Sequence, residues 1–558
     1  MNSELLQKLA KAQTDEERSW IVTESFLLTL SPELAAAVWA AVVPHWFNAE
    51  ILAALCPELQ TQSSQLYTEL QALPFVEEFP DRGHNVHDLT RNLMLKHLRL
   101  EPRDEFITLS QRAVEYFGSS NEQPETQIEW LYHLVVVDSE WKGSELWDLA
   151  QNWDNNFRVA ELESLITALL EQIAAERVAT PAKAEVYYWA GKAKFRVYRA
   201  TEALELYEAS LAFYRDTGSR WGEANTLRAI GDVLQFLDRR TEALECYEAA
   251  LAFYRDIGAR LGEANTLVEI GDVLQFLKRS TEALERYEAA LAFYRNIGAR
   301  LGEANTLKAI GDVLQFLDRR TEALERYEAS LAFYRDIGDR LGEANTLKAI
   351  GDVLQFLKRS TEALERYEAA LAFYRDIGDR LGEANTLKAI GDVLQFLDRR
   401  TEALERYEAS LAFYRDIGDR LGEANTLRAI GDVLQFLKRS TEALERYEAA
   451  LAFYRDIGAR LGEANTLIAI GILQENLTLG LEYCQAALEL YTQIGDKYSQ
   501  SRNLIYFTSE ILLKLGRQKE AVDALNCAIE LAREIHYQIF VEDATAKLQE
   551  IQENHEFH

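Results

Sequence analysis

The chain has 558 residues, of which 48% are hydrophobic and 27% are charged, a composition typical of a folded, water-soluble protein. Its formal net charge of −31 disfavours general affinity for nucleic acid or anionic membranes. The longest uncharged apolar run, Leu34 to Val43, is about half of the ~20 residues that a membrane-spanning helix needs. The first 20 residues carry too many charges for the apolar core of a signal peptide. We therefore expect a cytoplasmic protein.

The charge is distributed unevenly. Residues 1–180 hold 12 basic and 29 acidic side chains, which leaves 48 basic and 62 acidic ones for the rest of the chain. A partner attracted by the long-range electric field therefore meets the acidic first third.

The four cysteines indicate neither a disulfide framework nor a zinc site, because they lie far apart and none forms a C-x-x-C pair. Cys56 is predicted to lie in a core. Cys246 occupies a repeat position that holds arginine in later copies, so we interpret it as a tolerated surface variant.

The first elements in chain order are helical. Residues 1–26 are predicted to form an N-terminal helical segment, and residues 27–120 a separate domain. Within this domain two helical stretches precede a short apolar segment, a tight turn at Asp81 to Gly83, and a second short segment that leads into a helix from His87. This is the element order of a winged helix.

The domain resembles the winged-helix domain that follows the nucleotide-binding core of STAND-type signalling ATPases. In those proteins a methionine, histidine, aspartate triplet opens the last helix, and its histidine touches the nucleotide. The matching residues here are Val86, His87 and Asp88, and Leu89 and Arg91 continue the match. The sequence departs from the family in having valine for methionine and in lacking a G-x-x-x-x-G-K-[ST] phosphate loop. We therefore expect no cofactor and no ATP binding.

A winged helix can also read DNA, which requires basic residues on its recognition helix. The helix from His87 to Leu100 offers Arg91, Lys96 and Arg99, but the surrounding acidic region would repel a duplex. None of the eight histidines lies in the central repeats or joins a recognisable catalytic arrangement. His84 and His87 are predicted to cap or pack a helix and not to bind metal.

Residues 121–181 are predicted to be a helical adapter. All eight prolines lie before residue 182, and the remainder is rich in Ala, Leu, Glu and Arg. Since proline removes a backbone donor from a helix, this remainder is predicted to be nearly continuous helix interrupted by short turns.

From Thr201 to about Leu467 the sequence repeats every 40 residues. Each copy predicts two helices. In the first, Leu227, Ile230, Leu234 and Leu237 form one apolar stripe. In the second, from Thr241 as predicted N-cap to Gly258 as terminator, the matching stripe is Ala243, Tyr247, Ala250, Leu251 and Tyr254. One hairpin cannot bury both stripes, so the hairpins are predicted to stack as a solenoid.

The repeat resembles the tetratricopeptide repeat, because Gly231 and Ala243 are small residues set among large ones in the pattern by which such hairpins pack. The 40-residue period is similar to that of kinesin light chain and of spindle-orientation adaptors. The resemblance implies an all-α fold: a right-handed superhelical solenoid over residues 182–536 with about nine hairpins, and a C-terminal capping helix and tail over residues 537–558.

In the arrays that this chain resembles, the first helices line an inner groove that holds partner peptides. On a helical wheel, one polar stripe lies opposite the packed stripe of the first helix. We predict that it binds a partner through Asn225, Asn265, Asn305, Asn345, Asn385, Asn425, Asn465, Arg228, Lys308, Lys348, Lys388, Arg428, Asp312, Asp352, Asp392, Gln315, Gln355 and Gln395.

The basic run at Lys308, Lys348 and Lys388 is flanked by Val268 and Ile468. It predicts a protein or peptide partner with a central acidic stretch. The opposing interpretation is that Lys308 pairs with Asp312 and Phe236 packs on the next hairpin.

We predict a non-enzymatic interaction scaffold or sensor arm. The alternatives are a STAND-like switch acting with a separate NTPase or effector, and a winged-helix DNA-binding regulator.

Overall fold

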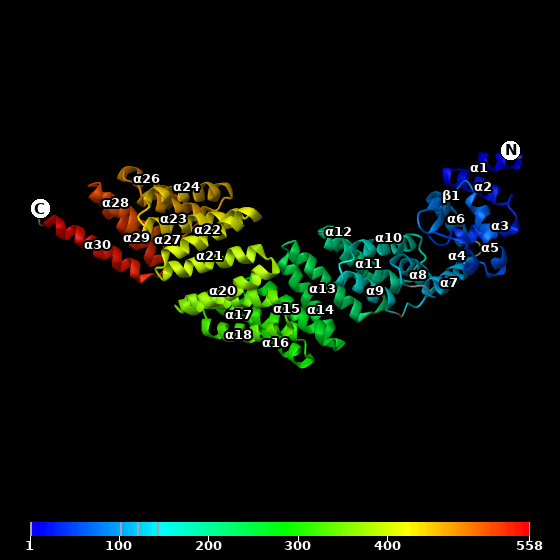
Figure 1. Cartoon of the computed structure of the whole chain (residues 1–558), viewed down its shortest axis with the longest axis horizontal. Helices are drawn as coiled ribbons and strands as arrows, with labels where there is room; N and C mark the ends of the chain where they lie inside the picture. The colour runs from blue at the N-terminus through cyan, green and yellow to red at the C-terminus, as the bar shows by residue number, and fades with distance from the viewer. Residues whose placement is uncertain (1–2, 101–102, 120–121, 142–143, 557–558) are drawn as a thin grey trace. The chain divides into compact units, whose positions relative to one another are not determined.

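The structure is a computed structural model that describes residues 3–100, 103–119, 122–141 and 144–556 (Figure 1). It confirms the predicted all-α fold class, since the described residues hold one two-stranded sheet and are otherwise helices and turns. Residues 1–279 and 280–558 are two compact units, and each is described by itself.

The first unit begins with short, well-capped elements. Thr14 and Glu17 form a reciprocal capping box, and Asn48 caps two backbone N–H groups. The elements are α1 (Ser3–Lys11), α2 (Asp15–Leu27), α3 (Pro32–Ala41), α4 (Ala49–Leu55), η1 (Pro57–Gln62), α5 (Ser63–Gln71), β1 (Val76–Phe79), β2 (Gly83–Val86) and α6 (Asp88–Leu100). β1 and β2 pair antiparallel, with Val76 opposite Val86. Phe47, between α3 and α4, bridges to His84 of β2, so the element order predicted for residues 27–120 is present.

The last helix of the predicted domain of residues 27–120, α7 (Arg103–Ser119), packs on α8 (Pro124–Val137). In the described part of residues 121–181, the predicted adapter, α8 is followed by α9 (Glu145–Asn155) and α10 (Val159–Ala174), and α10 contacts α8, α9 and the first repeat helix. Large aromatic side chains such as Tyr132 and Trp153 are fully buried among them.

The repeats follow as alternating first and second helices. In the first unit these are α11 (Thr180–Arg196), α12 (Ala200–Thr217), α13 (Arg220–Phe236), α14 (Arg240–Asp256) and α15 (Arg260–Phe276). In the second unit they are α16 (Ser280–Ile297), α17 (Arg300–Phe316), α18 (Arg320–Ile337), α19 (Arg340–Phe356), α20 (Ser360–Ile377), α21 (Arg380–Phe396), α22 (Arg400–Ile417), α23 (Arg420–Phe436), α24 (Ser440–Asp456), α25 (Arg460–Ile472) and α26 (Leu477–Gln493). The last elements are α27 (Lys497–Asn503), η2 (Leu504–Thr508), α28 (Ser509–Lys514), α29 (Gln518–Glu534) and α30 (Gln538–Glu556).

The turn inside each hairpin corrects one prediction. The second helix begins at Arg240 and not after Thr241, and its N-cap is Arg239, whose side chain makes no capping hydrogen bond. The chain leaves α13 through Asp238 in the left-handed region (φ 61°) and is helical again two residues later. Arg239 then holds Glu242 through two hydrogen bonds of 2.7 and 2.6 Å. At the other end Gly258 (φ 68°) follows the helix as predicted.

Two tyrosines of each second helix fill spaces that only glycine leaves open. A Cβ atom added at Gly231 would lie 2.5 Å from the ring of Tyr247, in the same hairpin. One added at Gly262 would lie 2.6 Å from the ring of Tyr254, in the preceding hairpin. The first contact therefore closes a hairpin and the second joins it to the next.

The first helices lie on the inner side of the array. In the second unit α17 packs against α19, α19 against α21, and α21 against α23, whereas neighbouring second helices lie farther apart. An array whose first helices approach more closely curves with those helices on its concave side. The predicted polar stripe thus lies on helices that contact their counterparts in successive hairpins of this unit.

We expect Gly231→Ala to destabilise the first unit. Helix propensity alone would favour alanine by up to ~1 kcal/mol, but the clash with Tyr247 should outweigh this and cost about 1–3 kcal/mol. All nine tryptophans lie at or before Trp221, so the urea midpoint followed by tryptophan fluorescence reports this unit. Thr241→Ala is the matched control, and it should change the free energy of unfolding by no more than about 0.5 kcal/mol. A loss of ~1 kcal/mol would instead indicate that Thr241 is the N-cap after all.

Candidate protein-binding face

The structure aligns the predicted polar residues in rows along the first helices of each unit. In the second unit Asn305, Asn345 and Asn385 are exposed, whereas Asn425 and Asn465 are half-buried. In the first unit Asn225 and Asn265 are half-buried. The exposed asparagines therefore belong to α17, α19 and α21.

A buried tyrosine hydroxyl binds each of these central asparagines. Tyr334 donates to Asn305 Oδ1 at 2.5 Å, Tyr374 to Asn345 at 2.7 Å, and Tyr414 to Asn385 at 2.7 Å. The tyrosine thus engages the amide oxygen and not the amide N–H₂. Our sequence analysis missed this contact, although a tyrosine predicted to be buried in every copy requires a partner for its hydroxyl.

The other tyrosine of each second helix binds the aspartate and glutamine rows. Tyr327 donates to Asp312 Oδ1 at 2.7 Å and to Gln315 Oε1 at 3.1 Å. The same pattern holds for Asp352 with Gln355 and for Asp392 with Gln395. Burial, and then the neighbouring Asp312 carboxylate, raise the pKa of Tyr327 well above its ordinary value, so the hydroxyl stays protonated and donates.

Each basic residue of the central run is paired with the aspartate one turn further on. Lys308 Nζ lies 2.9 Å from Asp312 Oδ2, Lys348 2.9 Å from Asp352, and Lys388 2.8 Å from Asp392. Arg428 pairs with Asp432 at 3.2 Å. The predicted i, i+4 pairs are confirmed, and they neutralise the lysines one for one.

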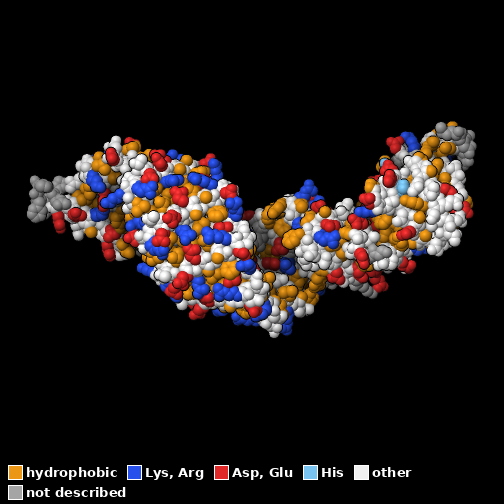
Figure 2. All heavy atoms as spheres, viewed as in Figure 1, with side chains coloured by type: hydrophobic (Ala, Val, Ile, Leu, Met, Phe, Trp, Pro, Cys, Tyr) orange, Lys and Arg blue, Asp and Glu red, His pale blue; other side chains and the backbone are white. Residues whose placement is uncertain are grey.

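The flanks of the basic run differ from the prediction. Arg228 reaches Glu269 of the next first helix at 2.9 Å. Ile468 is 5% exposed, so it belongs to the core and offers little apolar surface to a partner. Figure 2 likewise shows basic and acidic side chains interspersed, and not separated by sign, over the face of residues 280–558 turned to the viewer.

The phenylalanines that end the first helices are exposed. Phe316, Phe356, Phe396 and Phe436 are 62–68% exposed. The prediction that Phe236 packs on the next hairpin is wrong: its ring contacts Phe195 and Tyr198, which precede it.

The Val86, His87, Asp88 triplet lies where the wing enters α6. Val86 is buried, and His87 is exposed and accepts a hydrogen bond from the Leu89 backbone N–H at 3.4 Å. His84 binds the Tyr67 hydroxyl at 2.8 Å. Both histidines therefore cap or pack, as predicted.

Arg91 is not available to DNA, because it is only 4% exposed. Its guanidinium donates to Glu171, to the Tyr132 hydroxyl and to two backbone carbonyls. Lys96 pairs with Glu16, and the side chain of Arg99 lies outside the described residues. The described part of α6 thus presents no free basic face.

Arg91 belongs to a polar cluster that joins the loop after α3 to α6, α8 and α10. His45 Nδ1 lies 2.6 Å from Glu129 Oε1, and His45 Nε2 lies 3.1 Å from Glu171 Oε2. Burial alone would lower the pKa of His45, but the Glu129 charge and the hydrogen bonds to Glu129 and Glu171 together raise the pKa to about 9. Burial alone would raise the pKa of Glu171, but the His45 hydrogen bond and the Arg91 charge lower the pKa to about 2. The cluster is therefore charged at neutral pH.

The described residues hold no metal-binding cluster and no membrane-spanning helix. There, no three His, Cys, Asp or Glu side chains are arranged to hold a metal ion. No helix in this part of the chain is long and apolar enough to cross a membrane. Cys56 is buried, and all four cysteines are free thiols.

A family model for the tetratricopeptide repeat matches residues 183–256, 262–336, 304–376, 342–416 and 382–456. These residues are tetratricopeptide repeats, as their pattern predicted. Among curated proteins, no sequence matches this chain.

Several solved structures are similar to this chain at low sequence identity. They include a STAND protein with a tetratricopeptide repeat sensor from Pyrococcus horikoshii, with 14% identity, coverage of 81% of this chain and 67% of that one, and a TM-score of 0.49. The apo quorum sensor NprR from B. thuringiensis has 14% identity, coverage of 66% and 98%, and a TM-score of 0.46. A set of nearly identical kinesin-light-chain repeats from Podospora anserina has 16% identity, coverage of 35% and 97%, and a TM-score of 0.32. At this similarity none of them carries an argument about function.

The polar cluster gives the first unit a pH-dependent stability. The pKa of His45 is about 9 in the folded chain, against about 6.5 in the unfolded chain. Its contribution to stability is therefore fully present below pH 6.5, and it is lost as the pH rises to about 9. The urea midpoint read by tryptophan fluorescence should therefore fall between pH 6.5 and 9, and His45→Gln should flatten this slope. His536→Gln, in the other unit, should leave it unchanged; an equal slope in wild type and His45→Gln would assign the pH dependence to other groups.

Proposed function

We propose that the tetratricopeptide array is a non-enzymatic protein-binding scaffold, and that the concave face of residues 280–558 holds an extended segment of a partner protein. The observation that carries the proposal is the row of exposed asparagines on α17, α19 and α21, each oriented by a buried tyrosine hydroxyl. Since an immobilised donor loses little conformational entropy on binding, this arrangement favours recognition of a backbone.

An extended chain fits the spacing of the rows. Successive first helices lie roughly 10 Å apart, and an extended chain rises ~3.3 Å per residue. Each asparagine N–H₂ then meets a carbonyl about every third residue of the partner. Because the contact is to the backbone, it does not depend on the partner's side chains.

The lysines supply selectivity in this proposal. A lysine ammonium has three N–H donors, and the aspartate beside it accepts from one of them. The remaining donors of Lys308, Lys348 and Lys388 favour a partner whose central residues are acidic. Since each lysine is already paired, we expect this preference to be modest, on the order of the 0.2–1 kcal/mol of an exposed ion pair.

The Asn→Asp variants test the role of the amide donor. Asp at positions 305, 345 and 385 keeps an acceptor for the tyrosine but removes the N–H₂ group. Peptides selected from a displayed library against the full chain serve as the probe. Their affinity for the triple variant should fall at least tenfold, or about 1.4 kcal/mol, with unchanged helical circular dichroism.

Glu325→Gln, Glu365→Gln and Glu405→Gln together form the control, because these residues lie on exposed surfaces of the second helices. The control should bind the selected peptides normally. Equal affinity of the Asn→Asp variant and wild type would contradict the concave-face proposal.

The absence of a phosphate loop from the sequence motivates a second test. Calorimetric titration of the full chain with ATP and with ADP at millimolar concentration should give no binding. Micromolar affinity for either nucleotide would contradict the proposal that this chain works without a nucleotide of its own.

We also propose that residues 27–120 are a winged-helix-like module that docks on the helical adapter of residues 121–181. The Phe47–His84 bridge and the cluster of His45, Glu129 and Glu171 support this. The alternative of a STAND-like regulatory chain that acts with a separate NTPase or effector rests on the match at Val86, His87 and Asp88. The burial of Arg91 argues against the DNA-binding alternative.

A further inference from the structure

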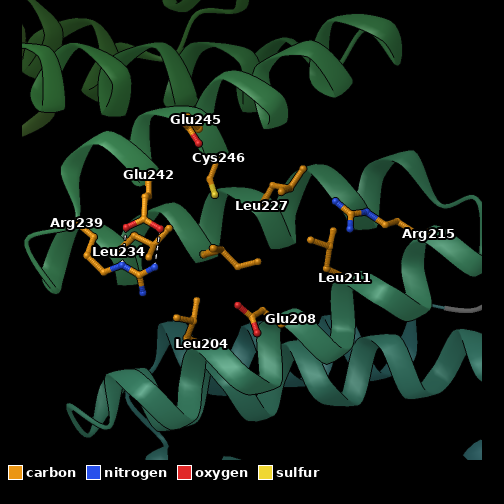
Figure 3. Close-up of a pocket in the computed structure, with 11 residues that line it drawn as sticks. Leu204, Glu208, Leu211, Arg215, Leu227, Leu234, Arg239, Glu242, Glu245 and Cys246 are labelled. Carbon is orange, nitrogen blue, oxygen red and sulfur yellow. Dashed lines mark hydrogen bonds and ion pairs between the residues drawn. The ribbon is translucent and has the colours of Figure 1, made fainter.

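A pocket of about 400 Å³ opens between the second helices α12 and α14, above the first helix α13 (Figure 3). Glu208 of α12 and Cys246 of α14 point toward it. Glu245 of α14 also lines it, and the part of the lining that α13 supplies, which includes Leu227 and Ile230, is called the floor. The pocket lies on the side of the array that carries the second helices, so it is separate from the concave face proposed above.

The later copies show which group occupies the equivalent place. There the residue at the position of Cys246 is arginine, and it pairs with the glutamate at the position of Glu208 in the preceding second helix. The pairs are Arg326 with Glu288 at 3.9 Å, Arg366 with Glu328 at 3.0 Å, Arg406 with Glu368 at 3.3 Å, and Arg446 with Glu408 at 3.1 Å. In these copies the guanidinium is an internal ligand of the glutamate.

The first pocket lacks that guanidinium. Within the described residues, neither Glu208 nor Glu245 forms an ion pair. The two arginines in the lining are engaged elsewhere: Arg239 holds Glu242 through two hydrogen bonds, and Arg215 lies 3.9 Å from Glu223. Glu208 and Glu245 therefore line the pocket without an ion-pair partner among the described residues, and the charge of Glu208 reaches Arg239 only at longer range.

The two floor residues are also more exposed than the residues at the same positions in later copies. Ile230 is 6% exposed, against 0% for Ile310, Ile350 and Ile390. Leu227 is 7% exposed, against 0–1% for the leucines at the same position in α17, α19 and α21. The aliphatic stem of an arginine covers apolar surface while its charged end stays at the rim, which accounts for the difference.

We propose that this pocket binds an arginine side chain of a partner protein, with the guanidinium on Glu208 and the stem over Leu227 and Ile230. The occupant takes the place that the chain's own arginine takes in later copies. Its positive charge suits the acidic first third of the chain, which attracts a basic surface by long-range electrostatics. Arginine fits better than lysine because its planar fork matches a carboxylate in two N–H···O bonds.

The test uses Cys246 as a reporter inside the pocket. The full chain is alkylated with a maleimide in the presence of acetyl-Gly-Arg-Gly-amide, and the modification of each cysteine is followed by peptide mass spectrometry. At millimolar peptide, alkylation of Cys246 should slow at least threefold, whereas that of the exposed Cys527 should not change. The citrulline peptide, a neutral isostere, should have no effect. No protection of Cys246 by the arginine peptide, or equal protection by the citrulline peptide, would overturn the proposal.

Three variants complete the test. Glu208→Gln should abolish the protection of Cys246. Cys246→Arg should close the pocket, leave the tryptophan-detected stability unchanged or higher, and abolish binding of the peptide measured by calorimetry. Arg366→Cys should open a matching pocket at Glu328, with a thiol at position 366 that the arginine peptide protects. Two results would contradict the proposal: no protection of the thiol in Arg366→Cys, or unchanged protection of Cys246 in Glu208→Gln. Either would show that the position left without an arginine does not define the site.

Discussion

The tyrosine ring held against a helical glycine is the contact on which the repeat array depends. Each second helix supplies two such rings: Tyr247 closes its own hairpin on Gly231, and Tyr254 joins it to the next hairpin at Gly262. Since a Cβ atom has no room at either glycine, the helices approach more closely than a pair of larger residues would allow. The same tyrosines carry hydroxyls that must find partners when buried. Packing of the core and orientation of the polar face are therefore consequences of one residue type.

The concave face is polar because of this arrangement, and it is also rigid. Tyr334 fixes the amide of Asn305, and Tyr327 fixes the carboxylate of Asp312, which in turn holds Lys308. The face thus carries amide N–H and ammonium donors whose positions are set by these contacts, and the lysine charges are neutralised by the aspartates. Such a surface suits recognition of a polypeptide backbone more than attraction of a strongly charged ligand.

The near-identity of the copies makes their few differences informative. Arginines link the second helices of successive hairpins in the second unit, and Cys246 interrupts that ladder in the first. The interruption leaves a pocket with the charge and floor of an arginine site. The first unit also holds the cluster in which Arg91 and His45 are paired with Glu129 and Glu171. The contacts that differ from the common repeat pattern thus lie where the repetition ends or is broken.

The sequence by itself determined the repeats, their two helices and the rows they carry, because a 40-residue period with apolar residues at helical spacing leaves one way to bury both stripes. It also predicted the Lys308–Asp312 pair and the capping roles of His84 and His87, which depend on neighbours within a few residues. Only the tertiary structure decided the contacts between residues far apart in the chain. These include the hydroxyl of Tyr334 on Asn305, the burial of Arg91, and the open place beside Cys246. Local periodicity specifies a helix face, but which atoms on that face remain free depends on side chains that other helices bring to it.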